Sequence, residues 1–406
     1  MRSRTLRMSR ASQPLVWMAA CFVPLVSASF LVTPKLESSN DCLAGDHALV
    51  TNKLHPGSSS NNYQCWRHGI APSTATGRTI LACSAWNGEQ YRLKQTRADE
   101  YYAQHHQLPR PAIMHAELPV KKGPHDDDDN SKNILVIGDV HGCMAELQSL
   151  LDKAVKDYND GQPFSFIILV GDLCNKGPQS AEVIRWARCT PNVFTVRGNH
   201  DDGALEAALG DGARRKKGKY QWVMAGEVDQ HELQGGASSD RIVLSDNDVS
   251  WLAQLPYTLT IPRWYLGESQ DTIIVHAGLI PNQPLEQQSI STMITIREVL
   301  PICDPNSRDK VVSHFEYHER QKGKPAQEGP GVVCGVPMPW ARAWYGPQRV
   351  IFGHDARRGF QRYKESHAIG LDTGAVYGKE LTGLILPGET IVSVPSKPYS
   401  RVGTSD

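Results

Sequence analysis

The sequence predicts an α/β protein whose reactive residues lie at the ends of strands. From residue 133 onward, apolar runs of strand length alternate with stretches whose apolar residues recur at helical spacing. Strand, helix, strand, helix, strand is the pattern of an α/β layer. Several apolar runs end in a short glycine-containing turn that carries an acid, an amide or a histidine. Because sites in open α/β sheets form beyond the carboxyl ends of the strands, we expect these turns to meet.

The individual elements follow one another in a regular order. The first predicted strand lies in NILVIGDVHG, which begins at Asn133, and the first helix is CMAELQSLLDKAVKDY. FSFIILVGD is the second strand, SAEVIRWARC is the second helix, and NVFTVRGNHDD contains the third strand. Three later apolar runs, DTIIVHAG, RVIFGHD and HAIGLDTG, also end in polar groups. We therefore expect six strands that deliver polar residues at their carboxyl ends.

The polar residues at these strand ends are of the types that bind metal ions. They are Asp139, His141, Asp172, Asn199, His200, His276 and His354. A single Gly-Asp pair after a strand is common, and a single histidine is usually a satisfied core or surface residue. Five such turns in succession (GDVHG, GDLCNKGP, RGNHD, HAG and FGHD) are hard to explain by packing alone. Mixed oxygen and imidazole ligands suit Mn, Zn or Fe better than Ca or Mg.

Asp172 is the expected bridge between two metal ions. It offers two carboxylate oxygens and lies in the chain between the Asp139 and His141 pair and the later ligands. Two metal ions about 3.5–4 Å apart stabilise both the attacking and the leaving oxygens of an in-line displacement. A hydroxide held between the metals would be the nucleophile, since the ions bring its pKa towards neutrality.

The five motifs together resemble those of the calcineurin-like metallophosphoesterases, in particular the branch with diadenosine tetraphosphatase and the ApaH-like phosphatases. GDLCNKGP, GNHDD, FGHDARRG and GLDTGAVYG are close to the ApaH-like pattern, and the resemblance covers roughly residues 133–393. It implies a calcineurin-like four-layer α/β fold with a central β-sandwich flanked by helices. It also implies a phosphatase with two divalent metal ions (Mn, Zn, Fe or Co).

The resemblance assigns the strand-end residues to two metal sites. The first metal would be held by Asp139, His141 and Asp172. The second would be held by Asp172, Asn199, His276 and His354.

The same resemblance assigns roles around the metals. His200 matches the general acid that protonates the leaving oxygen. Lys176 stands at the position of a phosphate-contacting arginine. Arg197 and Arg342 are further expected phosphate contacts, and a structural ion pair is the alternative for each of them.

Two positions depart from the protein Ser/Thr phosphatases of this superfamily, which carry Asp-Arg where this chain has Asn175 and Lys176. Asparagine can orient an imidazole by a hydrogen bond but cannot stabilise an imidazolium as a carboxylate does. Asp201 is a candidate to compensate, although adjacent side chains often diverge. Lysine replaces a planar bidentate fork with a compact mobile charge.

These departures bear on the substrate through its leaving group. A serine alkoxide resembles hydroxide, whose conjugate acid has a pKa of about 15.7, and needs a strong proton donor. Phosphate leaving from an anhydride has a second pKa of about 6 and departs with little help. We therefore expect hydrolysis of phosphoanhydrides: polyphosphate (an endopolyphosphatase-like activity), dinucleoside polyphosphates or an mRNA cap. The alternatives are a protein Ser/Thr phosphatase-like phosphomonoesterase and an inactive metal-binding module.

The N-terminus predicts a targeting segment. MRSRTLRMSR carries four arginines and no acid, and residues 14–32 carry no charge. This pattern is typical of a secretory signal peptide over residues 1–32, with cleavage after Ala28. An uncleaved signal anchor is the close alternative, because the stretch approaches the roughly 20 residues that span a bilayer. The expected location is the secretory pathway, in a vacuole- or lysosome-like lumen or as a type II membrane protein attached through residues 14–32. A transit peptide or a cytoplasmic location are the alternatives.

Composition and charge indicate how the rest of the chain is organised. Residues 33–132 are expected to form a variable N-terminal region with an acidic linker, 133–395 the metallophosphoesterase domain and 396–406 a tail. Lys plus Arg and Asp plus Glu number 43 each, which argues against general nucleic-acid binding. Disulfides among the nine cysteines would suit a lumenal protein, but sequence does not assign the pairs, and free buried thiols are the alternative.

Overall fold

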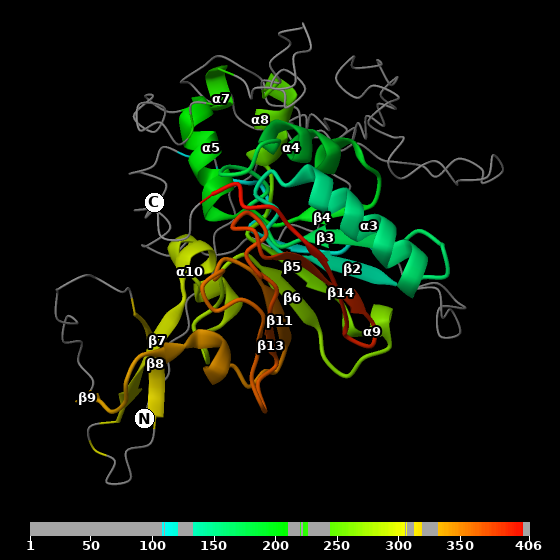
Figure 1. Cartoon of the computed structure of the whole chain (residues 1–406). Helices are drawn as coiled ribbons and strands as arrows, with labels where there is room; N and C mark the ends of the chain where they lie inside the picture. Colours follow the sequence, from blue (N-terminus) through cyan, green and yellow to red (C-terminus); the bar gives the residue numbers. More distant parts are fainter. Residues whose placement is uncertain are drawn as a thin grey trace, which may run out of the picture. The chain divides into compact units, whose positions relative to one another are not determined.

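The computed structural model describes most of the chain from residue 108 to residue 400, and Figure 1 shows its elements. The described residues are 108, 110–120, 133–209, 220, 222–225, 244–304, 306, 312–318 and 332–400. The expected signal or anchor over residues 1–32 and most of the region 33–132 lie outside them. Across the described part of the chain, no helix is both long and apolar enough to cross a membrane.

A five-stranded sheet carries the first three predicted strands. Its order is β15-β14-β2-β3-β4, in which β2, β3 and β4 are parallel and β14 and β15 are antiparallel to their neighbours. The strands are β2 (Ile134–Ile137), β3 (Phe166–Leu169), β4 (Val193–Thr195), β14 (Glu380–Leu386) and β15 (Thr390–Pro395). All residues of β2 are buried, which explains its continuous apolar run.

A six-stranded sheet carries the three later predicted strands. Its order is β1-β5-β6-β11-β13-β12, and β6, β11 and β13 run parallel. The strands are β1 (His115–Glu117), β5 (Thr258–Ile261), β6 (Thr272–Val275), β11 (Arg349–Phe352), β12 (Gln361–Arg362) and β13 (Ala368–Gly370). Because β1 pairs in parallel with β5, this sheet includes residues ahead of the domain start predicted at residue 133.

The two sheets pack against each other around a shared apolar core. Ile134 and Val136 of β2 lie in one cluster with Ile351 of β11. Leu135 and Ile137 lie in a second cluster, together with the apolar residues of the first predicted helix. Successive side chains of a strand point to opposite faces, so β2 contributes to both the inter-sheet core and the outer helical layer.

Helices cover the outer face of each sheet and complete four layers. The cluster on the five-stranded sheet draws on α3 (Met144–Tyr158), α4 (Ser180–Cys189), α5 (Asn199–Leu209), α7 (Trp222–Ala225) and α8 (Asp246–Leu252). The cluster on the six-stranded sheet draws on α10 (Ile290–Thr295) and the 3₁₀ helix η4 (Trp340–Ala343). Two short helices lie in connections, α9 (Arg263–Leu266) and η3 (Leu285–Gln287). The predicted α/β fold with a central β-sandwich flanked by helices is confirmed.

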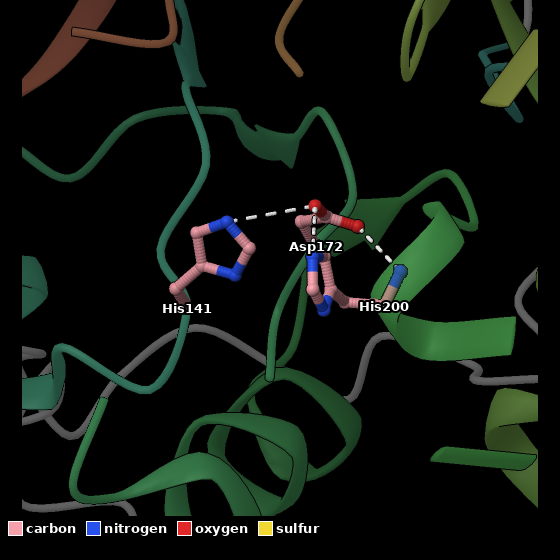
Figure 2. A group of neighbouring side chains, drawn as sticks. All are labelled: His141, Asp172 and His200. Carbon is pink, nitrogen blue, oxygen red and sulfur yellow. Dashed lines mark hydrogen bonds and ion pairs between the residues drawn. The ribbon is translucent and has the colours of Figure 1, made fainter. Parts of the chain in front are cut away.

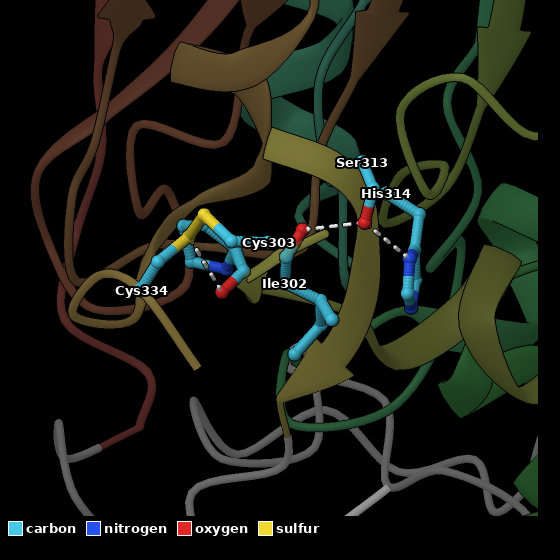
Figure 3. The surroundings of a disulfide bond; sticks show 6 residues. Ile302, Cys303, Ser313, His314 and Cys334 are labelled. Carbon is cyan, nitrogen blue, oxygen red and sulfur yellow. Dashed lines mark hydrogen bonds between the residues drawn. A yellow bond between two sulfur atoms is a disulfide. The ribbon is translucent and has the colours of Figure 1, made fainter. Parts of the chain in front are cut away.

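A third, smaller sheet was not predicted. It consists of β7 (Glu298–Cys303), β8 (Val312–His318), β9 (Val332–Val333) and β10 (Met338–Pro339), in the order β10-β7-β8 with β9 also paired to β7. A disulfide between Cys303 and Cys334 joins the end of β7 to the residue after β9, as Figure 3 shows. Cys189 is also disulfide-bonded, whereas Cys143 and Cys174 are buried thiols. Both kinds of cysteine expected from the sequence are therefore present.

Candidate metal centre

The predicted strand-end turns of both large sheets meet at one place. Asp172, His276 and His354 each offer a ligand atom within 4.8 Å of the others, and the same holds for His141, Asp172 and His200. His141, Asp172 and His200 follow β2, β3 and β4, whereas His276 and His354 follow β6 and β11. The site therefore lies at the carboxyl ends of strands from both sheets of the sandwich.

Asp172 belongs to both sets of residues, and Figure 2 shows it together with His141 and His200. Its Oδ1 is 3.3 Å from Nε2 of His276, and its Oδ2 is 3.5 Å from Nε2 of His141. The backbone N–H of His200 donates to Oδ1 at 2.9 Å. Gly198 permits this approach, because a Cβ at that position would lie 2.2 Å from Oδ1 of Asp172. The carboxylate thus presents one oxygen to each group of imidazoles.

The remaining two predicted ligands also lie in this centre. Oδ1 of Asn199 is 3.0 Å from Nε2 of His276. Oδ2 of Asp139 is 4.0 Å from Nε2 of His141, and the backbone N–H of His354 donates to both Asp139 oxygens at 3.0 and 3.1 Å. All six predicted metal ligands are therefore brought together.

The histidine rings are oriented as metal ligands are. Nδ1 of His141 lies 3.1 Å from the carbonyl oxygen of Cys174, and Nδ1 of His276 lies 3.0 Å from that of Val170. Each Nδ1–H donates to a carbonyl, which leaves the lone pair of Nε2 directed at Asp172. Nε2 of His354 is buried and has no hydrogen-bond partner among the described residues.

These contacts place acceptor atoms against acceptor atoms. Nε2 of His276, which carries no proton in this tautomer, faces oxygens of both Asn199 and Asp172. Burial lowers the pKa of His276, which keeps its ring neutral. Such a cluster of lone pairs is unfavourable unless a cation lies between them. The donor set therefore fits divalent metal ions.

The buried carboxylates need positive charge for the same reason. Burial raises the pKa of Asp139 well above its usual value, and the nearby Asp372 and Asp172 raise it further. Burial also raises the pKa of Asp372 to about 6. Ionising these neighbouring groups is costly in a water-excluded site, and bound cations would remove that cost.

His200 faces the same centre but is held differently. Its Nε2 lies 4.0 Å from Oδ2 of Asp172. Its Nδ1 contacts two neutral groups, the side-chain nitrogen of Asn175 at 2.8 Å and the hydroxyl of Tyr220 at 3.1 Å. Asn175 and Lys176 both adopt a positive φ, of 72° and 73°, which turns the Asn175 side chain back towards the ring. The sequence predicted Asn175 as a partner of His200, and it did not predict Tyr220.

Asp201 does not have the role predicted for it. Its carboxylate accepts hydrogen bonds from the backbone N–H groups of Asp172 and Leu173 at 2.9 and 3.0 Å, and from that of Gly198 at 2.9 Å. Asp201 therefore fixes the turn that carries Asp172 and does not replace the missing carboxylate at His200. The reason is geometric, since residues 200 and 201 are consecutive on α5 and point about 100° apart.

The three predicted phosphate contacts lie in different surroundings. Nζ of Lys176 lies 3.3 Å from Nε2 of His141, so Lys176 belongs to the site. Arg197 is 1% exposed and forms a buried ion pair with Asp202 at 2.7 Å. Its prediction as a phosphate contact is therefore wrong, and the alternative, a structural ion pair, holds. Arg342 lies exposed on η4, and none of its described contacts reaches the metal-ligand cluster.

Besides Tyr220, two further residues near the site were not predicted. Arg297 precedes β7, is 46% exposed, and donates from Nη2 to the carbonyl oxygen of His354 at 3.2 Å. Asp372 follows β13 and is buried, and its charge acts on Asp139. The strand-end turn GLDTG could have revealed Asp372, because it has the same form as the other five turns. No motif marks Arg297.

Comparisons with known proteins identify a family and several relatives. Residues 132–358 match the family described as calcineurin-like phosphoesterase. A symmetrical bis(5'-nucleosyl)-tetraphosphatase of Methylobacillus flagellatus is 30% identical over 295 residues, which cover 66% of this chain and 96% of the relative. The asymmetrical bis(5'-nucleosyl)-tetraphosphatase PrpE of Bacillus subtilis is 26% identical over 273 residues, with 66% and 96% covered. A symmetrical enzyme of Coxiella burnetii is 28% identical over 302 residues, with 67% and 94% covered.

Proposed function

Because the chain belongs to the calcineurin-like phosphoesterases, a family of metal-dependent hydrolases, we propose that it hydrolyses phosphoanhydride bonds with two divalent metal ions. The substrates would be dinucleoside polyphosphates or inorganic polyphosphate. The observation that carries this proposal is the neutral amide of Asn175, 2.8 Å from Nδ1 of His200.

The relatives support the substrate class. Similar curated proteins are bis(5'-nucleosyl)-tetraphosphatases, and their names include both symmetrical and asymmetrical cleavage. A dinucleoside tetraphosphate contains only anhydride bonds between its phosphates. Polyphosphate presents the same bond repeatedly, so it belongs to the same proposal.

The metals would occupy two sets of ligands that share Asp172. The first set is Asp139, His141 and Asp172, and the second is Asp172, Asn199, His276 and His354. When bound, divalent ions supply Lewis-acid stabilisation of phosphoryl charge and acidify water. The mixed nitrogen and oxygen ligands suit Mn, Zn, Fe or Co.

Cationic side chains flank both sets. Lys176 lies beside His141 of the first set, and Arg297 donates to the backbone of His354 in the second. A substrate with several phosphates would meet positive charge on both sides of the metals. Arg297 offers a planar guanidinium, of which Nε lies 3.8 Å from Oδ1 of Asp355, and Lys176 offers a mobile point charge.

His200 would act on the leaving oxygen from the Nε2 side. Its other nitrogen, Nδ1, contacts two neutral groups, the Asn175 amide and the Tyr220 hydroxyl. Neutral partners stabilise an imidazolium less than a carboxylate does. An anhydride, whose leaving phosphate has a second pKa of about 6, needs little protonation, so this arrangement suits an anhydride better than a serine ester.

The test is a substrate panel with purified protein and Mn, Zn, Fe or Co. The panel contains polyphosphate, a dinucleoside tetraphosphate, capped RNA and a phosphoserine peptide. We expect metal-dependent cleavage of an anhydride, and its loss together with bound metal in Asp172→Asn. Asp157→Asn, an exposed acid on α3, is the matched control and should behave as wild type. Full activity of Asp172→Asn would reject the metal assignment.

We also propose that the protein enters the secretory pathway. The residues that suggest it, 1–32, lie outside the described residues, but the disulfide-bonded Cys303, Cys334 and Cys189 suit an oxidising compartment. Expression of the chain with a C-terminal tag, with and without residues 2–32, tests this. Cytosolic tagged protein in both cases would overturn it.

A further inference from the structure

We propose that Tyr220 is a positioning residue that holds the His200 imidazole in its working orientation. The inference rests on His200 acting at the leaving oxygen, which is part of the proposed function. Tyr220 is 20 positions away from His200 in the sequence and belongs to none of the family motifs quoted above.

The contact is direct and protected from water. The Tyr220 hydroxyl lies 3.1 Å from Nδ1 of His200, and the two residues are 3% and 2% exposed. Their ring centroids are 6.4 Å apart, with the ring planes tilted by 32°. Because the hydroxyl reaches the nitrogen opposite Nε2, it restrains the ring on the side away from Asp172.

Asn175 alone would hold the ring less firmly. An amide nitrogen only donates hydrogen bonds, whereas a phenol hydroxyl both donates and accepts. Tyr220 can therefore hold Nδ1 whichever ring nitrogen carries the proton. Two partners on different segments of the chain also fix the ring plane, which one partner cannot do.

Gly203 makes room for this contact. It lies on α5, one turn after His200, where glycine costs about 1 kcal/mol relative to alanine in helix interiors. A Cβ at Gly203 would lie 2.2 Å from the Tyr220 hydroxyl and 2.4 Å from Cζ. The absence of a side chain at position 203 is what allows the tyrosine to reach His200.

The first test removes the hydroxyl and keeps the ring. Tyr220→Phe should lower kcat about three- to tenfold, the loss expected for one hydrogen bond, with KM and bound metal per chain unchanged. Gly203→Ala should lower kcat in the same way, because it displaces the hydroxyl without altering it. Tyr158→Phe, an exposed tyrosine at the end of α3, should match wild type.

The second test asks whether Tyr220 acts through His200. In a His200→Asn background, Tyr220→Phe should cause no further loss, since a residue that acts only through another has no effect once that residue is removed. An equal fold loss in both backgrounds, no loss in wild type, or a loss of bound metal would overturn the inference.

In both tests, kcat and KM are measured separately with a dinucleoside tetraphosphate and with 4-nitrophenyl phosphate. Each variant is compared with its own parent on the same substrate. Failure of the proposed anhydride preference would change the ratio between the two substrates in wild type. The effect of Tyr220→Phe relative to its parent could still be measured with either substrate. Failure of the proposed function and failure of the Tyr220 inference are therefore distinguishable.

Discussion

The side-chain nitrogen of Asn175 lies 2.8 Å from Nδ1 of His200, at the position where the sequence departs from the aspartate expected in protein Ser/Thr phosphatases. The contact joins the turn after β3 to the start of α5 and is buried on both sides. It combines an oriented imidazole with a neutral partner. That combination links the geometry of the site to the choice of leaving group.

Replacing Asn175 with aspartate should shift the substrate preference. In Asn175→Asp, the carboxylate stabilises a protonated His200, which favours poor leaving groups such as a serine alkoxide. We expect kcat/KM for a phosphoserine peptide to rise on the order of tenfold relative to that for a dinucleoside tetraphosphate. Asn175→Ala, which only removes the contact, should lower both values. An unchanged ratio in Asn175→Asp would contradict this role.

Removing Arg297 should weaken the binding of substrates that carry several phosphates. Its half-exposed guanidinium lies beside His354 and can form a charge-assisted hydrogen bond to phosphate. In Arg297→Ala, we expect kcat/KM for a dinucleoside tetraphosphate to fall roughly 10- to 100-fold, mainly through KM. Arg297→Lys should retain part of the activity. Arg342→Ala should lower kcat/KM less than Arg297→Ala does. A larger loss in Arg342→Ala would support the phosphate contact that the sequence predicted for Arg342.

The disulfide should stabilise the small sheet. It joins Cys303 to Cys334 across a sequence separation of 31 residues, and closing a loop of this size contributes about 2–4 kcal/mol. The double variant Cys303→Ser and Cys334→Ser should lower the free energy of unfolding by that amount, measured by chemical denaturation. An unchanged denaturation midpoint would show that the bond adds no stability.

His115 should make the protein less stable in mild acid. Burial lowers the pKa of His115 to about 4, below its ordinary value of 6.5, and Nδ1 contacts the Thr258 hydroxyl at 2.8 Å. The unfolded chain therefore binds more protons between pH 4 and pH 6.5, so stability falls as the pH drops through this window.

The corresponding measurement is thermal unfolding at pH 6.5 and at pH 5. Between these two values, His115 should cost wild type about 1.5 kcal/mol, and His115→Gln should show a smaller drop in melting temperature. The same drop in both proteins would mean that other groups carry the acid sensitivity.

The sequence predicted the parts of the fold that leave a local pattern. Buried β2 and β3 appear as apolar runs, and α3 and α4 span the predicted helical stretches. The small sheet left no such pattern, because the residues of β8 are half-buried or exposed and β9 and β10 have two residues each. Likewise, β1 has three residues, and its partner β5 lies more than 140 positions along the chain.

The same distinction separates the site residues that could be predicted from sequence from those that could not. The six candidate metal ligands and His200 follow strands in recognisable turns, so their meeting could be predicted. The contacts of Tyr220 and Arg297 depend on segments far apart in sequence, and no spacing encodes them. Arg197 and Asp201 lie in the RGNHD turn, but a position in the sequence does not fix where a side chain points.

The most direct test of the central claim is the ratio of kcat/KM for a dinucleoside tetraphosphate to that for a phosphoserine peptide, measured on the wild-type, metal-loaded protein. The neutral partners of His200 predict a ratio well above one, on the order of 100, since general acid catalysis is worth roughly 10²–10⁴. A ratio near one or below it would contradict the account. It would mean that His200 protonates a poor leaving group as well as a histidine paired with a carboxylate does.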